Sequence, residues 1–315
     1  TYNNLNMKNI YKNSFYNLNK AKKILEKNKI IAVPTETVYG LAGNAYSNKS
    51  VKRIYSLKKR PKKNPLIIHY YNLDLLKKDA KYDKNFLKLY KKFSPGPLTY
   101  ILKKRKSSKV SKFANAKLKT IAVRFPNNKV IRSLLKKLNF PLAIPSANIS
   151  TGVSPTEPLD VVDEFKNKIK FILNGGKSII GLESTVINLI NKPRILRPGA
   201  ISNIQIGKIL KKKVSNVAGS KLIVSPGMLK RHYSPGIPMK LNSIKPDYKA
   251  AFIVFGKKYK MKKDMFNLSK NNNLKEAAKN LYKILRKIKK LKYKKINVVK
   301  IPNKNIGIAI NDRLK

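Results

Sequence analysis

Two cations stand two residues apart at the end of a predicted helix. The stretch SLKKRPKKNPLIIHYY holds Lys58 and Arg60 directly before Pro61, which favours a helix end at this point. Because the chain turns there, both side chains can face one cleft, one as a point charge and the other as a bidentate fork for phosphate or carboxylate. Asn64 offers an amide beside them, and His69 follows in the next apolar run. The competing interpretation is that the cations only complement the helix dipole.

Further polar side chains stand at the ends of short apolar runs that are typical of buried strands. PTETVYG follows IIAV and offers the hydroxyl groups of Thr35 and Thr37, although an ordinary turn with threonine caps would look the same. In TIAVRF, Thr120 and Arg124 are an even number of residues apart, so a strand would turn both to one face. Arg124 interrupts an apolar strand, and a buried charge needs a partner.

The second half of the chain repeats this arrangement. PLAIPSANISTGVSPT places Ser146 and Asn148 in alternation after an apolar run, with Ser154 further on. GLESTVINL begins a predicted strand near Ser184, and RILRPGAI presents Arg197 before a Pro-Gly turn. Each of these patterns is weak alone, but together they predict one site built from hydroxyls, amides and guanidinium forks.

Several common catalytic centres are excluded by composition. The chain has no cysteine and only two histidines, His69 and His232, which excludes disulfides, thiolate nucleophiles and cysteine-ligated zinc. NGGKS (174–178) lacks the first glycine of a phosphate-binding P-loop. We find no apolar run long enough to span a membrane and no apolar leader near the start, so we expect a cytoplasmic protein. Because the chain has no cysteine and so few histidines, we also expect no protein-bound metal.

The net charge of +58 suggests nucleic-acid binding, because phosphate neutralisation dominates such affinity. However, only ten of the 72 basic residues are arginine, and lysine is spread along the whole chain together with abundant Asn, Ile and Tyr. Such a bias is typical of AT-rich codon usage. We therefore expect weak non-specific RNA binding, while an arginine in this chain indicates a need for a planar fork.

Strand and helix patterns alternate from residue 18 to residue 212, which predicts an α/β fold with a largely covered sheet. The Pro- and Gly-rich stretch that follows interrupts the rhythm and indicates a linker. After it, AAFIVF, a long amphipathic helix over 274–291, INVVKIP and a last helix predict a second, small α/β unit. The predicted limits are a polar tail at 1–14, a first domain at 15–212, a linker at 213–239 and a second domain at 240–315.

In this order, the motifs resemble the YrdC-like domain of the threonylcarbamoyl-AMP synthase family, over about residues 21–209. The family's K-x-R and S-x-N tetrad corresponds to Lys58, Arg60, Ser146 and Asn148, and PTETVYGLAGNA, RPKKNPLIIH, SPGPLTYIL, VRFP, SANISTGVSPT, GLESTVI and ILRPGAI match in sequence. The linker SPGMLKRHYSPGIP resembles that of the longer form, which adds a small Rossmann-like domain. The resemblance implies a twisted open mixed sheet with helices, followed by that domain.

The resemblance also implies an activity: condensation of L-threonine, bicarbonate or CO2, and ATP to threonylcarbamoyl-AMP and pyrophosphate. A threonylcarbamoyl transferase would then modify tRNA beside the anticodon, and Mg²⁺ would arrive with ATP. The tetrad would be catalytic. Threonine would be held by Thr35, Thr37, His69, Arg124 and Ser184. ATP would be held by Lys58, Arg60, Asn64, Thr120, Ser146, Asn148, Ser154, Arg197, His232 and Tyr233, the last two as a lid from the linker.

The departures from the family pattern are few. Lys59 stands where the family often has glycine, YGLAGNA replaces YGLGA, and the C-terminal domain looks shortened. A carbamoyl transferase of the hydrogenase-maturation type also contains this module, but its zinc modules need cysteine. The remaining alternative is a non-catalytic basic RNA-binding protein.

Overall fold

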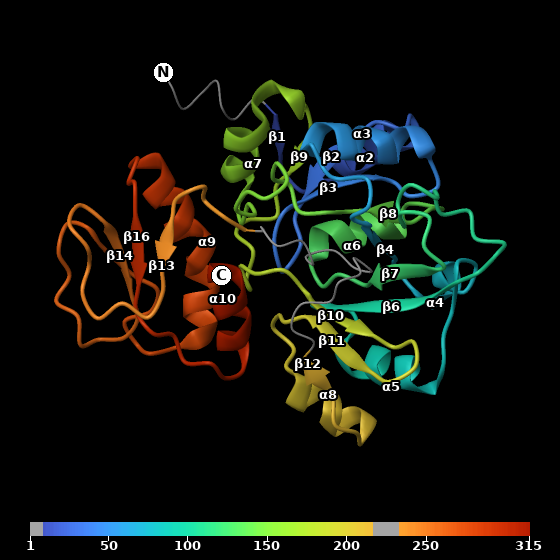
Figure 1. Cartoon of the computed structure of the whole chain (residues 1–315). Coiled ribbons are helices and arrows are strands. Elements are labelled where there is room, and N and C mark those ends of the chain that lie inside the picture. The colour runs from blue at the N-terminus through green and yellow to red at the C-terminus, as the bar shows by residue number, and fades with distance from the viewer. Residues whose placement is uncertain (1–8, 217–232) are drawn as a thin grey trace.

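The computed structural model describes residues 9–216 and 233–315 and arranges them around two sheets (Figure 1). The larger sheet contains, in spatial order, β1 (Ile10–Tyr11), β9 (Ile172–Leu173), β2 (Ile31–Val33), β3 (Gly40–Asn44), β8 (Leu142–Ala143), β4 (Ile67–His69), β7 (Thr120–Arg124), β6 (Leu98–Lys104), β10 (Thr185–Asn188), β11 (Arg194–Arg197) and β12 (Ser215–Asn216), with β5 (Ala80–Lys81) paired to β6. Parallel and antiparallel neighbours are mixed, which confirms the predicted mixed α/β class.

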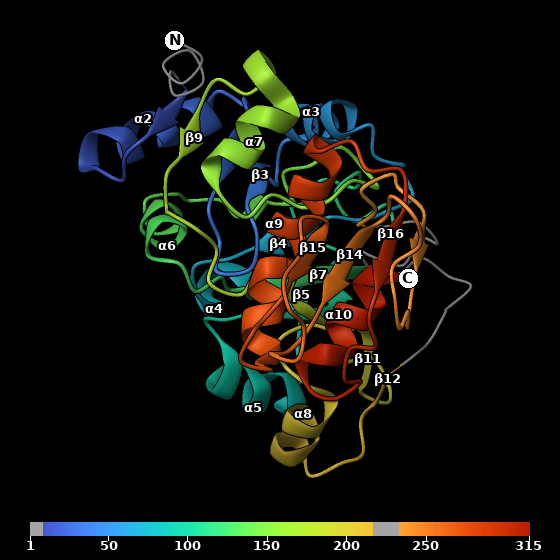
Figure 2. The same ribbon diagram turned by 90° about the vertical axis from the view of Figure 1, so that its left-hand side faces the viewer.

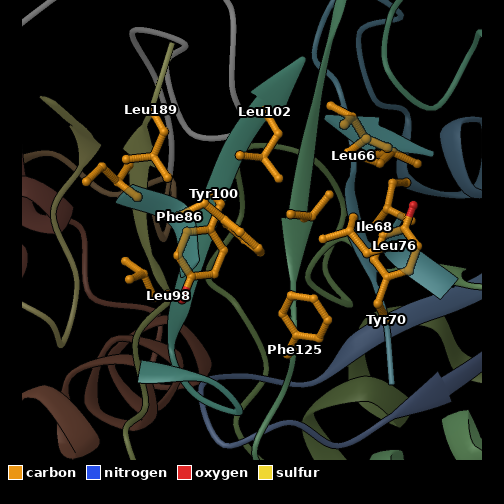
Figure 3. Packing of buried hydrophobic residues seen from close by; sticks show 14 of the residues in the cluster. Leu66, Ile68, Tyr70, Leu76, Phe86, Leu98, Tyr100, Leu102, Phe125 and Leu189 are labelled. Atoms are coloured by element: carbon orange, nitrogen blue, oxygen red, sulfur yellow. The ribbon is translucent and has the colours of Figure 1, made fainter. Parts of the chain in front are cut away.

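Helices cover this sheet because each carries an apolar stripe. They are α2 (Phe15–Glu26), α3 (Asn48–Lys58), α4 (Leu73–Leu76), α5 (Lys84–Phe93), α6 (Lys129–Lys136), α7 (Pro158–Phe165) and α8 (Asn203–Leu210), with a 3-10 turn at Lys166–Lys168. The largest core cluster joins α3, α5 and α8 to strands β4, β6, β7 and β10. Figure 3 shows part of this cluster, including Phe86 beside Tyr100. The centroids of these two rings are 5.0 Å apart.

Helix α3 ends as its sequence predicts, and its end fixes the position of the first cation pair. Ser47 caps the N-terminus by accepting a hydrogen bond from the Ser50 N–H. Lys59 follows the last helical residue in the left-handed conformation, with φ 50°. The Arg60 N–H then donates to the Tyr55 carbonyl, and the chain leaves the helix at Pro61. Lys58 is thereby buried under the helix end, while the Lys59 side chain is exposed.

The second sheet is parallel, in the order β13 (Met239–Lys240), β16 (Ile296–Val298), β14 (Ala251–Val254) and β15 (Met265–Asn267). Helices α9 (Leu274–Lys290) and α10 (Ile306–Leu314) lie between this sheet and the larger part of the molecule (Figures 1 and 2). The stripe predicted on α9 is buried from Ala277 to Ile288, whereas Leu291 at its end is exposed.

The structure adds elements that the pattern did not predict. Ile10–Tyr11, expected in a polar tail, form β1 against β9, and Ser14 caps α2. β12 lies within the stretch expected to be a linker, and β13 begins at the last residue of that stretch, Met239. The limits 15–212 and 240–315 remain our proposal for the two domains. In the described part of the chain, no helix combines the length and the apolar character needed to cross a bilayer.

Candidate functional site

Eleven of the fifteen predicted site residues line one pocket. They come from eight separate stretches of the chain: Thr35, Thr37, Lys58, Arg60, His69, Arg124, Ser146, Asn148, Ser184, Arg197 and Tyr233. Val38, Tyr39, Ile144, Pro145 and Gly152 provide much of the remaining wall.

Strand pairing accounts for part of this convergence. β4 and β7 are parallel neighbours, and their register places His69 beside Arg124 at their carboxyl ends. β6 runs antiparallel to β7, so Thr99 near its start lies opposite Arg124. The hydroxyl groups of Thr99 and Ser184 are 2.7 Å apart. Arg197, at the end of β11, completes the group by donating from Nε to the Ser184 carbonyl oxygen at 3.0 Å.

The two hydroxyl-rich loops approach each other at a glycine. Thr35 Oγ1 closes its own turn by donating to the Val38 carbonyl at 2.6 Å, and it lies 2.8 Å from Thr37 Oγ1. Gly40 then forms a β-bridge with Ser146. A Cβ at Gly40 would lie 2.9 Å from the Pro145 carbonyl oxygen, so only glycine allows the backbones this close.

Hydrogen bonds to backbone carbonyls and to Asn64 hold the side chains of Lys58 and Arg60. Lys58 Nζ donates to the carbonyl oxygens of Ser146, at 2.5 Å, and Asn148. Burial, and then the charge of Arg60, lower the pKa of Lys58 well below its usual value. Arg60 Nη2 donates to Asn64 Oδ1 at 2.7 Å and to the Pro65 carbonyl at 2.8 Å. Burial lowers the pKa of Arg60 to about 10, so its guanidinium remains a cation at neutral pH.

The charge of Arg124 is balanced by the buried carboxylate of Glu36. Glu36 Oε1 lies 2.7 Å from Arg124 Nη2, and both side chains are at most 5% exposed. Among the described residues, neither Glu36 oxygen accepts a well-oriented hydrogen bond. Burial, and then the charge of Arg124, hold the pKa of His69 well below its usual value, so His69 is neutral at pH 7.

Three predicted residues lie outside the pocket lining. Asn64 supports Arg60 from the side, and Ser154 donates to Glu183 Oε1 at 2.5 Å. Thr120 begins β7, so it lies about 13 Å along the strand from Arg124. Even spacing fixes the face of a strand but not the end at which a side chain stands. His232 lies outside the described residues.

The structure adds two acidic residues that the sequence analysis did not select. Glu183 lines the pocket beside Arg197 and Tyr233, and Glu36 pairs with Arg124. Burial opposes ionisation of Glu183, but the charges of Arg313 and Arg197, with hydrogen bonds from Ser154 and Arg313, lower its pKa. The sequence did offer a signal, because the chain has only 14 acidic residues and these two stand in PTETVYG and GLESTVINL, which hold no other charged residue.

The pocket has a cavity volume of about 60 Å³. This is room for about four water molecules. No cluster of three or more His, Asp or Glu side chains that could hold a metal ion exists within residues 9–216 and 233–315.

Comparisons with known proteins match both parts of the chain. Residues 23–199 match a family described as "Telomere recombination", and residues 201–315 match one described as "Threonylcarbamoyl-AMP synthase, C-terminal domain". The threonylcarbamoyl-AMP synthase of Pyrococcus abyssi is 35% identical, over 92% of this chain and 91% of its own. That of Bacillus subtilis is 38% identical, over 71% and 66% respectively.

A solved structure agrees with these matches over nearly the whole chain. The crystal structure of P. abyssi Sua5 complexed with L-threonine superposes with a TM-score of 0.87 at 32% identity, covering 97% of this chain and 96% of that one. The agreement includes the second sheet and its helices, as the coverage requires. With the motif order, the pocket and both domain matches in accord, this chain belongs to the threonylcarbamoyl-AMP synthase family.

Proposed function

We propose that this protein is an L-threonylcarbamoyladenylate synthase, which condenses L-threonine, bicarbonate or CO2, and ATP to threonylcarbamoyl-AMP and pyrophosphate. The observation that carries the proposal is the convergence of Lys58, Arg60, Arg124 and Arg197 on one pocket with the Thr35 and Ser146 hydroxyls. Family membership and the threonine-bound relative support it.

The pocket's chemistry suits anionic substrates. The threonine amine attacks CO2 and loses a proton to give a carbamate, and a carbamate oxygen then attacks the α-phosphate of ATP while pyrophosphate leaves. Charge develops on the phosphate, where a fixed cation such as Arg60 stabilises it. The reaction needs positioning and exclusion of water rather than a protein nucleophile. Mg²⁺ would enter as part of the ATP substrate.

The proposed residue roles rest on the family resemblance, and the shared pocket supports them. Arg124 binds the threonine carboxylate, with Thr35, Thr37, neutral His69 and Ser184 around the rest of the amino acid. Lys58, Arg60, Ser146, Asn148 and Arg197 hold the triphosphate and nucleoside, and Tyr233 forms a wall. We propose supporting roles for Asn64 and Ser154, through Arg60 and Glu183 respectively, and we keep Thr120 and His232 as candidate ATP contacts.

The partners of the reaction are a further part of the proposal. The product is a reactive mixed anhydride, so a transferase that carries its threonylcarbamoyl group to tRNA must consume it. We propose that the protein works in the cytoplasm, where ATP and tRNA are available, and that its RNA contacts are weak and non-specific.

The test is pyrophosphate release from ATP in the presence of bicarbonate. We expect release that depends on L-threonine and falls at least 100-fold in Arg60→Ala and Asn148→Ala, as typical for a lost transition-state contact. Arg53→Ala serves as the control, because Arg53 is an exposed arginine on α3, the helix that ends just before Arg60. Tight RNA binding without threonine-dependent turnover would instead support the non-catalytic alternative.

A further inference from the structure

A second, larger hollow lies on the C-terminal domain, away from the pocket described above. Its cavity volume is about 660 Å³, against about 60 Å³ for the catalytic pocket on the same measure. It is lined by Asn242, Ser243, Ile244, Phe255, Lys257, Lys258, Tyr259, Asn272, Val299, Lys300 and Pro302. We call this set of residues the C-terminal groove. Its size is that of a pocket for a small organic ligand.

The topology of the small sheet places the groove. β13, β16 and β14 are adjacent parallel strands that end at Lys240, Val298 and Val254. All the groove residues except Asn272 lie within five residues after one of these ends, in the stretches 242–244, 299–302 and 255–259. In open parallel α/β sheets, the crevice outside the carboxyl ends of the strands is where ligands bind.

The loop after β14 is shaped by its own contacts. Gly256 has φ +101°, a conformation that other residues rarely adopt, and a Cβ there would lie 2.3 Å from Asn272 Oδ1. The Gly256 N–H donates to the Ser269 carbonyl at 2.8 Å, and Asn267 Nδ2 donates to the Gly256 carbonyl at 2.9 Å. The loop is thus fixed at its start, which holds Phe255 at the strand end.

Rings and cations stand together in the groove. The Tyr259 ring packs edge-on against Phe252 with centroids 6.2 Å apart, so Phe252 anchors it. Lys257, Lys258 and Lys300 come from two different loops and are exposed. None of the described lining residues is acidic, and the nearby Asp247 is already engaged by Lys240 at 3.2 Å.

We propose that the C-terminal groove binds a nucleoside 5′-phosphate, with the lysines on the phosphate and the aromatic side chains against the base. Lysine is a common point-charge ligand of phosphate, and aromatic rings stack on any base. Asn242 and Asn272 add amide groups for the sugar or base edge. The nucleotide is either free or the phosphorylated end of an RNA strand, which share this chemistry.

Methyl NMR separates this site from the catalytic pocket in one spectrum. Ile244 and Val299 line the groove, whereas Val38 and Ile144 line the pocket. We expect AMP to shift the Ile244 and Val299 methyl signals in a saturable way. Inorganic phosphate and adenosine should each bind the groove about tenfold more weakly than AMP, because each lacks one half of the contacts. Equal affinity for phosphate and AMP, or no shift of these methyls, would overturn the proposal.

A matched pair of double variants tests the charges. Lys257→Glu with Lys300→Glu should weaken AMP binding at Ile244 and Val299 at least about tenfold. Lys283→Glu with Lys294→Glu changes the same charge at exposed positions outside the groove and should leave it unchanged. An equal loss in both pairs would show a diffuse charge effect and refute the site. A 5′-phosphorylated hexaadenylate, compared with AMP, identifies the source of the nucleotide.

Discussion

At the scale of single residues, the pairing of Arg124 with Glu36 stands out because both groups are buried. In Glu36→Gln the guanidinium loses its counter-charge, which should reduce the free energy of unfolding by about 3–5 kcal/mol. If Arg124 binds the threonine carboxylate, as proposed, the ligand then restores a partner. L-Threonine should therefore raise the melting temperature of Glu36→Gln more than that of the wild type, measured by scanning fluorimetry.

The opposite result would be informative. If Glu36 serves mainly to orient Arg124, the threonine-induced rise in melting temperature should shrink in Glu36→Gln. Glu26→Gln provides the control, because Glu26 is an exposed residue paired with Lys22 at 3.7 Å, and such pairs contribute little.

His69 predicts a pH dependence with a definite sign. Burial and Arg124 lower its pKa in the folded state, so the unfolded chain binds a proton first as the pH falls below about 6.5. Stability should then decrease by up to about 1.4 kcal/mol per pH unit until the folded-state pKa is reached. His69→Gln removes this term. Between pH 7 and pH 5, its melting temperature should therefore fall less than that of the wild type, and parallel curves would contradict the prediction.

At the scale of elements, the backbone conformation at the end of α3 is unfavourable for the residue that stands there. The frequent glycine of the family at position 59 already suggested this. Lys59 occupies a left-handed position with φ 50°, where glycine is favoured. Lys59→Gly should relieve about 1 kcal/mol and raise the melting temperature by a few degrees. Lys52→Gly, at an exposed position inside the same helix, should instead lower stability by up to about 1 kcal/mol. Changes of the same sign in both variants would argue against this account of Lys59.

Periodicity predicted the elements that have strong patterns, such as α3, β4, β7 and α9. It did not predict β3, because Gly40–Asn44 contains residues that are poor in strands and is held by pairing with β2 and β8. The order of motifs predicted most of the pocket. The Glu183–Arg313 pair joins residues 130 apart, and nothing local in one sequence indicates such a contact.

At the scale of the whole molecule, Glu183 connects the two domains at the edge of the pocket. Arg313 of α10 donates from Nε to Glu183 Oε2 at 2.9 Å, and Tyr282 of α9 donates to the same oxygen at 2.8 Å. The Arg313 guanidinium also lies 4.6 Å from the centre of the Tyr233 ring, and Tyr233 stacks on Tyr282. A wall of the pocket is therefore packed against the C-terminal domain, so docking of that domain and nucleotide binding should be coupled.

This coupling predicts a graded pair of effects. Arg313→Gln leaves the buried Glu183 carboxylate without its main cation and removes the guanidinium contact with the Tyr233 ring, so it should cost about 3–5 kcal/mol of stability and raise the KM for ATP. Tyr282→Phe keeps the ring stack and loses one hydrogen bond to a charged group, which costs about 1–3 kcal/mol and should change that KM less. Steady-state kinetics at varied ATP, below the melting temperature of each variant, separate the two effects. If Arg313→Gln has a lower melting temperature yet keeps the wild-type KM for ATP, the interface only stabilises the fold. If Tyr233 shapes the nucleotide site, loss of its contact with Arg313 must alter nucleotide binding.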